Sequence, residues 1–467
     1  METSAATLAP GRTSSPSSAT RWSHLKSRIL GTESGHVSLS VWAFRFLLWY
    51  ICVMLVQPQN RYTFLWPLHI ADISFVGACV LHFLDCLQNR RPFLSSNAST
   101  WLGLGLIILA YISNTFGVFQ NGWAGWNPYM DVMVKNLLLF ILVGTMARSV
   151  ERVWALQMVV LSCTLWWVKS GLRLSASGAT FSGDRLMGAA IGLIENPNSF
   201  AYMLCFMLPL YLYAYQQSTR KWAKWFFLAG ALASVYTIFQ TGSRTGMVTL
   251  IAIGIFLLPH YGRGHWRSIL IIVVAVAIML PFSGERNIQR FKTIPQSALR
   301  FLGFKSEDSE LNYGRPMNQD EQSSDERSSK NLDTWRLIMN HPLFGVGMVP
   351  SGDKLAEEGY PMARGQVHCE ILMVGKQMGF IGMFLYAGSL LTAWFCGEAV
   401  KRKARRMQWS SIGALGWTFQ MQVVANAVGG FFCPGPWGSP MMIMVGSSIA
   451  LWTALRDMPV EGVIRAV

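Results

Sequence analysis

Long apolar runs constrain this chain more than any other feature of its sequence. A helix that crosses a bilayer needs about 20 consecutive, mostly apolar residues. About twelve runs of that kind are present, and polar residues gather between them. The sequence therefore predicts an all-α polytopic membrane protein with about 12 transmembrane helices. The predicted spans are 41–57, 64–84, 100–118, 129–147, 153–169, 199–216, 225–241, 246–260, 268–282, 377–396, 409–429 and 439–455.

The composition agrees with this class. Only 13% of the 467 residues are charged, whereas about 25% are charged in an average soluble protein. A net charge of +15 would also suit a protein that binds nucleic acid. However, the basic residues lie in short loops between apolar runs, which is the positive-inside pattern of membrane proteins. We therefore expect the lipid bilayer, and no nucleic acid, to be a partner.

The charges also predict an orientation. With the N-terminus in the cytoplasm, every inside loop is basic, and the run KRKARR at 401–406 is the strongest case. The short outside loops near 58–63, 118–128 and 430–438 carry only Arg61 between them. Both termini are therefore predicted to be cytoplasmic. The expected organisation is a disordered tail 1–40, spans 1–9 in 41–282, a large loop 283–376 on the outer side, spans 10–12 in 377–455, and a tail 456–467.

The large loop has two kinds of sequence. Its acidic, Ser-rich patch NQDEQSSDERSSKN predicts a disordered middle. Apolar residues among polar ones predict a short surface helix over 333–341, and the proline and glycines of HPLFGVG, 341–347, predict that this helix stops there. A loop of this length is translocated largely regardless of its charge.

The eight cysteines give no sign of a cross-linked or metal-binding protein. No CxxC pair is present, and no cysteine has a metal-like spacing to a histidine. Cysteines within apolar runs behave as small hydrophobic residues. We expect no disulfide framework, no metal site and no other cofactor.

Arginines on the predicted periplasmic side are candidates for binding an anion. Arg244 lies in the turn TGSRTG between two spans, and Arg185, Arg286 and Arg290 also face outside near membrane ends. Each could be an interfacial arginine that snorkels to lipid headgroups. As a set they oppose the positive-inside trend, and a guanidinium matches phosphate oxygens bidentately. The set therefore indicates an anionic ligand.

His368 is the candidate general base. It closes the large loop directly before a predicted span, and a neutral imidazole suits proton abstraction near pH 7. A purely structural histidine is the alternative. Glu370 is too close in sequence to share a helix face with His368, but from an irregular segment it could orient or polarise the site. In ENPNSF, Asn198 or Ser199 is either a helix cap or, for Asn198, a polar contact to a sugar or headgroup.

Four strings in this order resemble the O-antigen ligase family, which includes Wzy-type polymerases and protein O-oligosaccharide ligases. They are NPNSFAYML, TGSRTGMVTL, TWRLIMNHPLFGVG and VHCEILMVGKQMGFIGMFLY, and the resemblance covers roughly 185 to 400. It implies a GT-C-type membrane glycosyltransferase in the bacterial inner membrane with a periplasmic active site. Such enzymes join a glycan from an undecaprenyl-pyrophosphate donor to an acceptor hydroxyl, with inversion and without a metal. O-antigen transferred to lipid A core is the first expectation.

The family's residues can be carried over by position. Arg244 matches the arginine of the SR turn, and His368 matches the histidine that closes the loop. Arg290 most resembles the arginine that follows the span entering the loop, with Arg286 as the fallback. Further candidates for binding the pyrophosphate or glycan are Arg185, Asn198 and Glu370.

The sequence also departs from the family pattern. Cys369 stands where relatives often have asparagine, and Asn331, beside Lys330, stands where they often have an arginine four residues before Trp335. These departures leave the acceptor open among lipid A core, another glycan and protein. Three other functions also stay open: a polymerase of the same superfamily, a transporter of lipid-linked polysaccharide, and a non-catalytic scaffold. A transporter would show midplane charges or two related halves, and neither is clear in the sequence.

Overall fold

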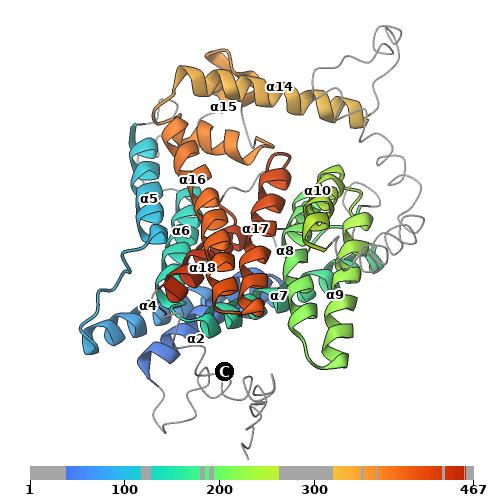
Figure 1. Ribbon diagram of the computed structural model, residues 1–467. Helices are drawn as coiled ribbons and strands as arrows, with labels where there is room; N and C mark the ends of the chain where they lie inside the picture. The colour runs from blue at the N-terminus through green and yellow to red at the C-terminus, as the bar shows by residue number, and fades with distance from the viewer. Residues whose placement is uncertain are drawn as a thin grey trace, which may run out of the picture.

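The computed structural model describes residues 38–116, 128–178, 185–188, 194–261, 319–348, 352–363, 367–433, 437–456 and 458. These residues form a helical bundle with one further long helix lying across its end, and they include no β-strand (Figure 1). The helices are α2 (Leu39–Val56), α3 (Pro58–Arg61), α4 (Ile70–Gln88), α5 (Ala98–Phe116), α6 (Pro128–Met146), α7 (Val150–Ala176), α8 (Pro197–Gln217), α9 (Lys221–Gln240), α10 (Arg244–Tyr261), α14 (Gln319–Asn340), α15 (Gly352–Glu357), α16 (Glu370–Arg406), α17 (Ser410–Gly430) and α18 (Ser439–Arg456).

Seven helical segments in the described ranges are long and apolar enough to cross a membrane. This confirms the prediction of an all-α polytopic membrane protein. Eleven of the predicted spans coincide with α2, α4 to α10 and α16 to α18. The predicted span 268–282 lies outside the described residues, as do residues 1–37, Arg286 and Arg290. The count of 12 therefore stays a prediction.

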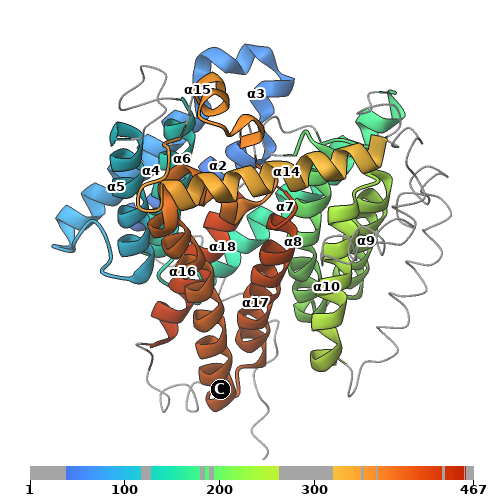
Figure 2. The same ribbon diagram turned by 90° about the horizontal axis from the view of Figure 1, so that it is seen from above.

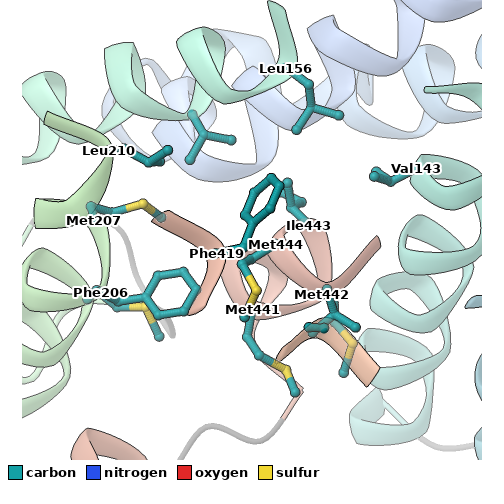
Figure 3. Packing of buried hydrophobic residues seen from close by; sticks show 14 of the residues in the cluster. Val143, Leu156, Phe206, Met207, Leu210, Phe419, Met441, Met442, Ile443 and Met444 are labelled. Carbon is teal, nitrogen blue, oxygen red and sulfur yellow. The ribbon is translucent and has the colours of Figure 1, made fainter. Parts of the chain in front are cut away.

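The centre of the bundle is a continuous apolar core. Most residues of α8 and α18 are buried, 15 of 21 and 14 of 18, as expected for helices that are apolar on most sides. Figure 3 shows side chains from α6, α7, α8, α17 and α18 meeting around Phe419. The outer helices instead expose large apolar side chains, among them Trp49, Trp101, Ile255 and Phe384. Exposure of this kind suits contact with lipid.

The large loop contains a long helix where a disordered stretch was expected. Helix α14 begins at Gln319, so most of the acidic patch is helical and that expectation is wrong from 319 onward. The Glu326–Lys330 salt bridge, 2.6 Å and four residues apart, is one local reason. Packing of α14 on α16 is another. The helix ends at Asn340, directly before the predicted stop sequence.

Helix α14 runs across one end of the bundle. In both views it passes over the start of α16 and extends toward α10 (Figures 1 and 2). Beneath it, α16 begins at Glu370, seven residues before the predicted start of that span. Its helix is broken at Met378 and Gly379, which have non-helical backbone angles. Residues 370–377 therefore form a short separate helix under α14.

The loop 341–347, which follows α14, packs into the break in α16. A break in a helix frees backbone groups, and in an apolar bundle each needs a partner. This loop and α5 supply the partners. The hydrogen bonds are from Val346 N–H to the Lys376 carbonyl (2.8 Å), from Gly347 N–H to the Gln377 carbonyl (3.2 Å), from Phe380 N–H to the Pro342 carbonyl (2.7 Å), and from the Ser113 hydroxyl to the Gln377 carbonyl.

This docking predicts which glycines cannot be replaced. Gly345 and Gly379 both have φ of 65°, and a Cβ on either would lie 2.5 Å from a backbone atom of the other segment. We expect Gly345→Ala or Gly379→Ala to lower the free energy of unfolding by about 1–3 kcal/mol. Thermal unfolding in detergent would measure this. Gly388→Ala in the same helix is the control, because a Cβ there meets nothing within 4 Å. Equal stability of all three variants would contradict the docking.

Candidate functional site

One amide oxygen brings together three of the predicted site segments. Oδ1 of Asn198 accepts hydrogen bonds from the Ser243 hydroxyl and from Nη2 of Arg185, both at 2.9 Å. Nε of Arg185 also donates to the carbonyl of Thr241 at 2.9 Å. The turn between α9 and α10, which leads into Arg244, is thereby fixed to the start of α8 and to Arg185.

Arg244 is the first residue of α10, and its side chain is half-buried. The preceding Ser243 caps the helix, because its hydroxyl accepts from the N–H of Gly246 at 3.2 Å. A helix N-terminus carries a partial positive charge and free N–H groups. Arg244 and the end of α10 therefore combine a full and a partial positive charge at one place, which suits an anionic ligand.

The start of α8 differs from the sequence prediction. Helix α8 begins at Pro197, and its cap is Asn196, whose Oδ1 accepts from the N–H of Asn198 at 2.8 Å. The expectation that Asn198 or Ser199 caps this helix is wrong. Because Asn196 takes that role, the side chain of Asn198 is available to hold Arg185.

Glu370 lies inside the bundle. The expectation that it acts from an irregular segment is therefore wrong. It is the first residue of α16 and only 3% exposed. Residues of α8, α16 and α17 surround its carboxyl group, which therefore joins three helices. The Tyr386 hydroxyl donates to it at 2.5 Å and Nδ2 of Asn426 at 3.1 Å. The Tyr202 hydroxyl lies 3.3 Å from it and has a shorter hydrogen bond, 2.6 Å, to Oδ1 of Asn426.

Helix α8 connects two groups of residues. The first is Arg185 and Arg244, called the arginine cluster below, and the second is Glu370 with its hydrogen-bond partners, called the Glu370 network. Asn198 and Tyr202 are four residues apart on that helix, a separation of about 6 Å along its axis. Asn198 holds Arg185 and the turn of Arg244, while Tyr202 reaches Glu370. Because His368 is two residues from Glu370, Arg185, Arg244 and His368 belong to the same end of the bundle.

His368 is half-buried beneath α14. Burial, followed by the positive charges of Arg327 and Lys330, lowers the pKa of His368 from 6.5 to about 4, and Glu326 opposes this in part. Both burial and a nearby cation disfavour the charged imidazolium. The imidazole is therefore neutral at pH 7 and has a nitrogen lone pair that can accept a proton.

Arg327 and Lys330 are residues that the sequence prediction missed. In the sequence, Lys330 stands out only as the neighbour of Asn331, and Arg327 does not stand out. On α14 they follow the spacing of one helix face with Thr334 and Leu337, which are both fully buried. That spacing was a usable signal, but it required the acidic patch to be recognised as helical.

The cysteines near His368 are not nucleophiles at neutral pH. Cys369, which stands where relatives often have asparagine, is fully buried, and burial raises the pKa of its thiol. Sγ of Cys433 lies 3.3 Å from the Ser199 hydroxyl, and burial raises the pKa of Cys433 to about 12. Because the thiolate is the reactive form, neither side chain supports covalent catalysis.

A second cluster lies at the end of α4. His82, Asp85 and Cys86 are buried, and their potential ligand atoms lie within 4.8 Å of one another. The sequence analysis found no cysteine at a metal-like spacing from a histidine and so overlooked this set. Its members share one helix face at positions i, i+3 and i+4. Nε2 of His82 lies 2.9 Å from the Phe93 carbonyl, and the Cys86 thiol donates to the Pro92 carbonyl at 3.6 Å. These contacts tie α4 to the loop that follows it.

The comparison with known families agrees with the motifs. A family model described as O-antigen ligase matches residues 229–387, which is about a third of the chain. The match confirms the resemblance to this family over residues 229–387, which contain Arg244, His368 and Glu370. It supports a function of the ligase or polymerase type. No curated protein matches the chain.

The cationic face of α14 leads to a prediction about His368. We expect Arg327→Gln to raise the pKa of His368 toward 6.5, because it removes a positive charge that disfavours the imidazolium. NMR titration of ¹⁵N-histidine-labelled protein would measure this, with His368→Gln to assign the signal. Arg336→Gln is the control on the same helix, since its side chain is 64% exposed and pairs with Asp333. An unchanged pKa in Arg327→Gln would contradict the arrangement.

Proposed function

We propose that this chain, whose residues 229–387 match the O-antigen ligase family model, transfers a glycan from undecaprenyl pyrophosphate to an acceptor hydroxyl. The reaction takes place at the periplasmic face of the bacterial inner membrane, in a GT-C-type fold, and lipid A core is the favoured acceptor. One observation carries the proposal: His368, kept neutral by burial and by the cations of α14, lies at the same end of the bundle as Arg244 and Arg185.

The arginines act on the leaving group. When the bond between the anomeric carbon and the pyrophosphate oxygen breaks, negative charge grows on the pyrophosphate. Fixed positive groups stabilise that charge without reorganising. Arg244 with the N-terminus of α10, Arg185 and Arg327 have this role. Pyrophosphate is a good leaving group, so the reaction needs neither a general acid nor a metal.

His368 acts on the acceptor. It accepts the proton of the attacking hydroxyl, which forms a new bond to the anomeric carbon from the face opposite the pyrophosphate. One displacement inverts that carbon. A pKa of about 4 makes a weak base. Negative charges of a bound donor raise it, because a nearby anion favours the imidazolium. His368 therefore becomes an effective base when the donor is in place.

The other predicted residues have supporting roles. Asn198 holds Arg185 against the turn that carries Arg244, as their hydrogen bonds indicate. Glu370 is a positioning residue that fixes the start of α16, because its carboxyl group accepts hydrogen bonds from Tyr386 and Asn426 within the bundle. Arg290, or Arg286 in its place, remains a proposed pyrophosphate ligand. Lys330 adds positive charge beside Arg327.

Transfer in proteoliposomes tests the proposal. Wild-type protein receives a lipid-linked glycan with lipid A core or another acceptor, and the products are analysed by mass. We expect glycan on lipid A core, and we expect Arg244→Ala to lower the rate by about 100-fold. Arg402→Ala is the control, because Arg402 is exposed at the other end of α16 and pairs with Glu398.

Other products would identify the other functions. Longer lipid-linked chains would make the protein a polymerase. Movement of glycan across the bilayer without a new glycosidic bond would make it a transporter. A wild-type rate of glycan transfer by Arg244→Ala would show that Arg244 does not stabilise the leaving group.

A further inference from the structure

A cavity of about 670 Å³ lies beside the arginine cluster. Its walls come from the end of α2, from α3, from the last turns of α7 and from the backbone on either side of 189–193. Among the described residues that line it are two arginines, Arg61 and Arg173, one carboxylate, that of the exposed Glu195, and Trp166 and Asn196. A concave site with a few polar groups and an aromatic side chain is typical of small-ligand binding.

The cavity adjoins the proposed reaction site. Asn196 lines it and caps α8, two residues before Asn198, which holds Arg185. Asn196 is also six residues before Tyr202, about 9 Å along the axis of α8. Tyr202 contacts Glu370, so α8 connects the cavity to the network that fixes the start of α16.

The lining has the chemistry of an anionic saccharide site. The guanidinium of Arg61 lies 5.5 Å from the centre of the Trp166 ring, and this contact orients both side chains. Arg173 occupies the last turn of α7. Arginine suits phosphate or carboxylate oxygens, and Lys169, whose Nζ also lies 5.5 Å from the centre of the Trp166 ring, adds a further positive charge beside Arg61. Amide groups of Gln57 and Asn60 on the same walls suit sugar hydroxyls.

The two substrates need separate sites. The acceptor hydroxyl must approach the anomeric carbon from the face opposite the pyrophosphate, so the group that anchors the acceptor cannot be the cluster that anchors the donor. Arg61 is also the one charged residue of the three loops near 58–63, 118–128 and 430–438, which are predicted to face outside. An arginine at that place, facing a cavity, suits a ligand with negative charge.

We propose that this cavity binds the acceptor saccharide through a phosphate or carboxylate group on it. The inference rests on the proposed function for the identity of the reaction. Arg61 and Arg173 bind the anionic group, Trp166 holds the guanidinium of Arg61 in place, and the amides of Gln57 and Asn60 bind sugar hydroxyls. The cavity thereby selects acceptors that carry negative charge.

Steady-state kinetics with varied acceptor concentration test this proposal. We expect Arg61→Gln and Arg173→Gln each to raise the acceptor KM by about tenfold, with kcat and the donor KM unchanged. With an acceptor freed of phosphate by a phosphatase and lacking carboxylates, the variants should equal the wild type. Arg402→Gln is the matched exposed control. A rise in the donor KM, or an equal rise in KM for both acceptors, would overturn the proposal.

Direct binding separates this inference from the proposed function. Saturation-transfer NMR would compare glucosamine 6-phosphate with glucosamine on detergent-solubilised protein. We expect binding of the phosphorylated sugar that weakens in both arginine variants. If transfer fails with every acceptor but this binding is seen, the cavity binds an anionic saccharide and the proposed function is wrong. If transfer occurs but neither variant changes the acceptor KM, the proposal for the cavity is wrong and the proposed function is supported.

Discussion

A buried carboxyl group, that of Glu370, and its hydrogen-bond partners hold this end of the protein together. A polar group taken out of water costs free energy unless it is hydrogen-bonded. Tyr386 of α16 and Asn426 of α17 donate to Glu370, and the Tyr202 hydroxyl of α8 donates to Asn426 and lies 3.3 Å from Glu370. The start of α16 is fixed by those bonds, and so is the place of His368, which precedes it by two residues. The arginine cluster at the start of α8 is attached to the same network.

Electrostatics then determines what His368 can do. The helix α14 places Arg327 and Lys330 close enough to lower the pKa of His368, and it can do so because its loop is docked into the break of α16. The cations that weaken the free histidine as a base are the kind of groups that attract a pyrophosphate. A bound donor reverses their effect by bringing negative charge. Donor binding and base activation are therefore linked by one set of charges.

Much of the fold followed from the sequence, because long apolar runs specify helices locally. Arg185, Asn198 and Arg244 were likewise recognised as separate candidates, but no local pattern says that Asn198 and Arg185 are hydrogen-bonded. The partners of Glu370 lie far away along the chain and cannot be found from spacing. The sequence predicts disorder where α14 is helical, for a different reason. Its first half reads as polar and Ser-rich, and the helix depends on i, i+4 pairs and on packing against α16.

The central claim is that His368 accepts the acceptor's proton, and the rate of transfer by His368→Gln tests it most directly. The amide keeps a polar side chain at that place but cannot act as a base. At saturating donor and acceptor, a rate about 10²–10⁴ times lower than that of the wild type is predicted, with donor binding retained. A rate within a few-fold of the wild type would contradict the account.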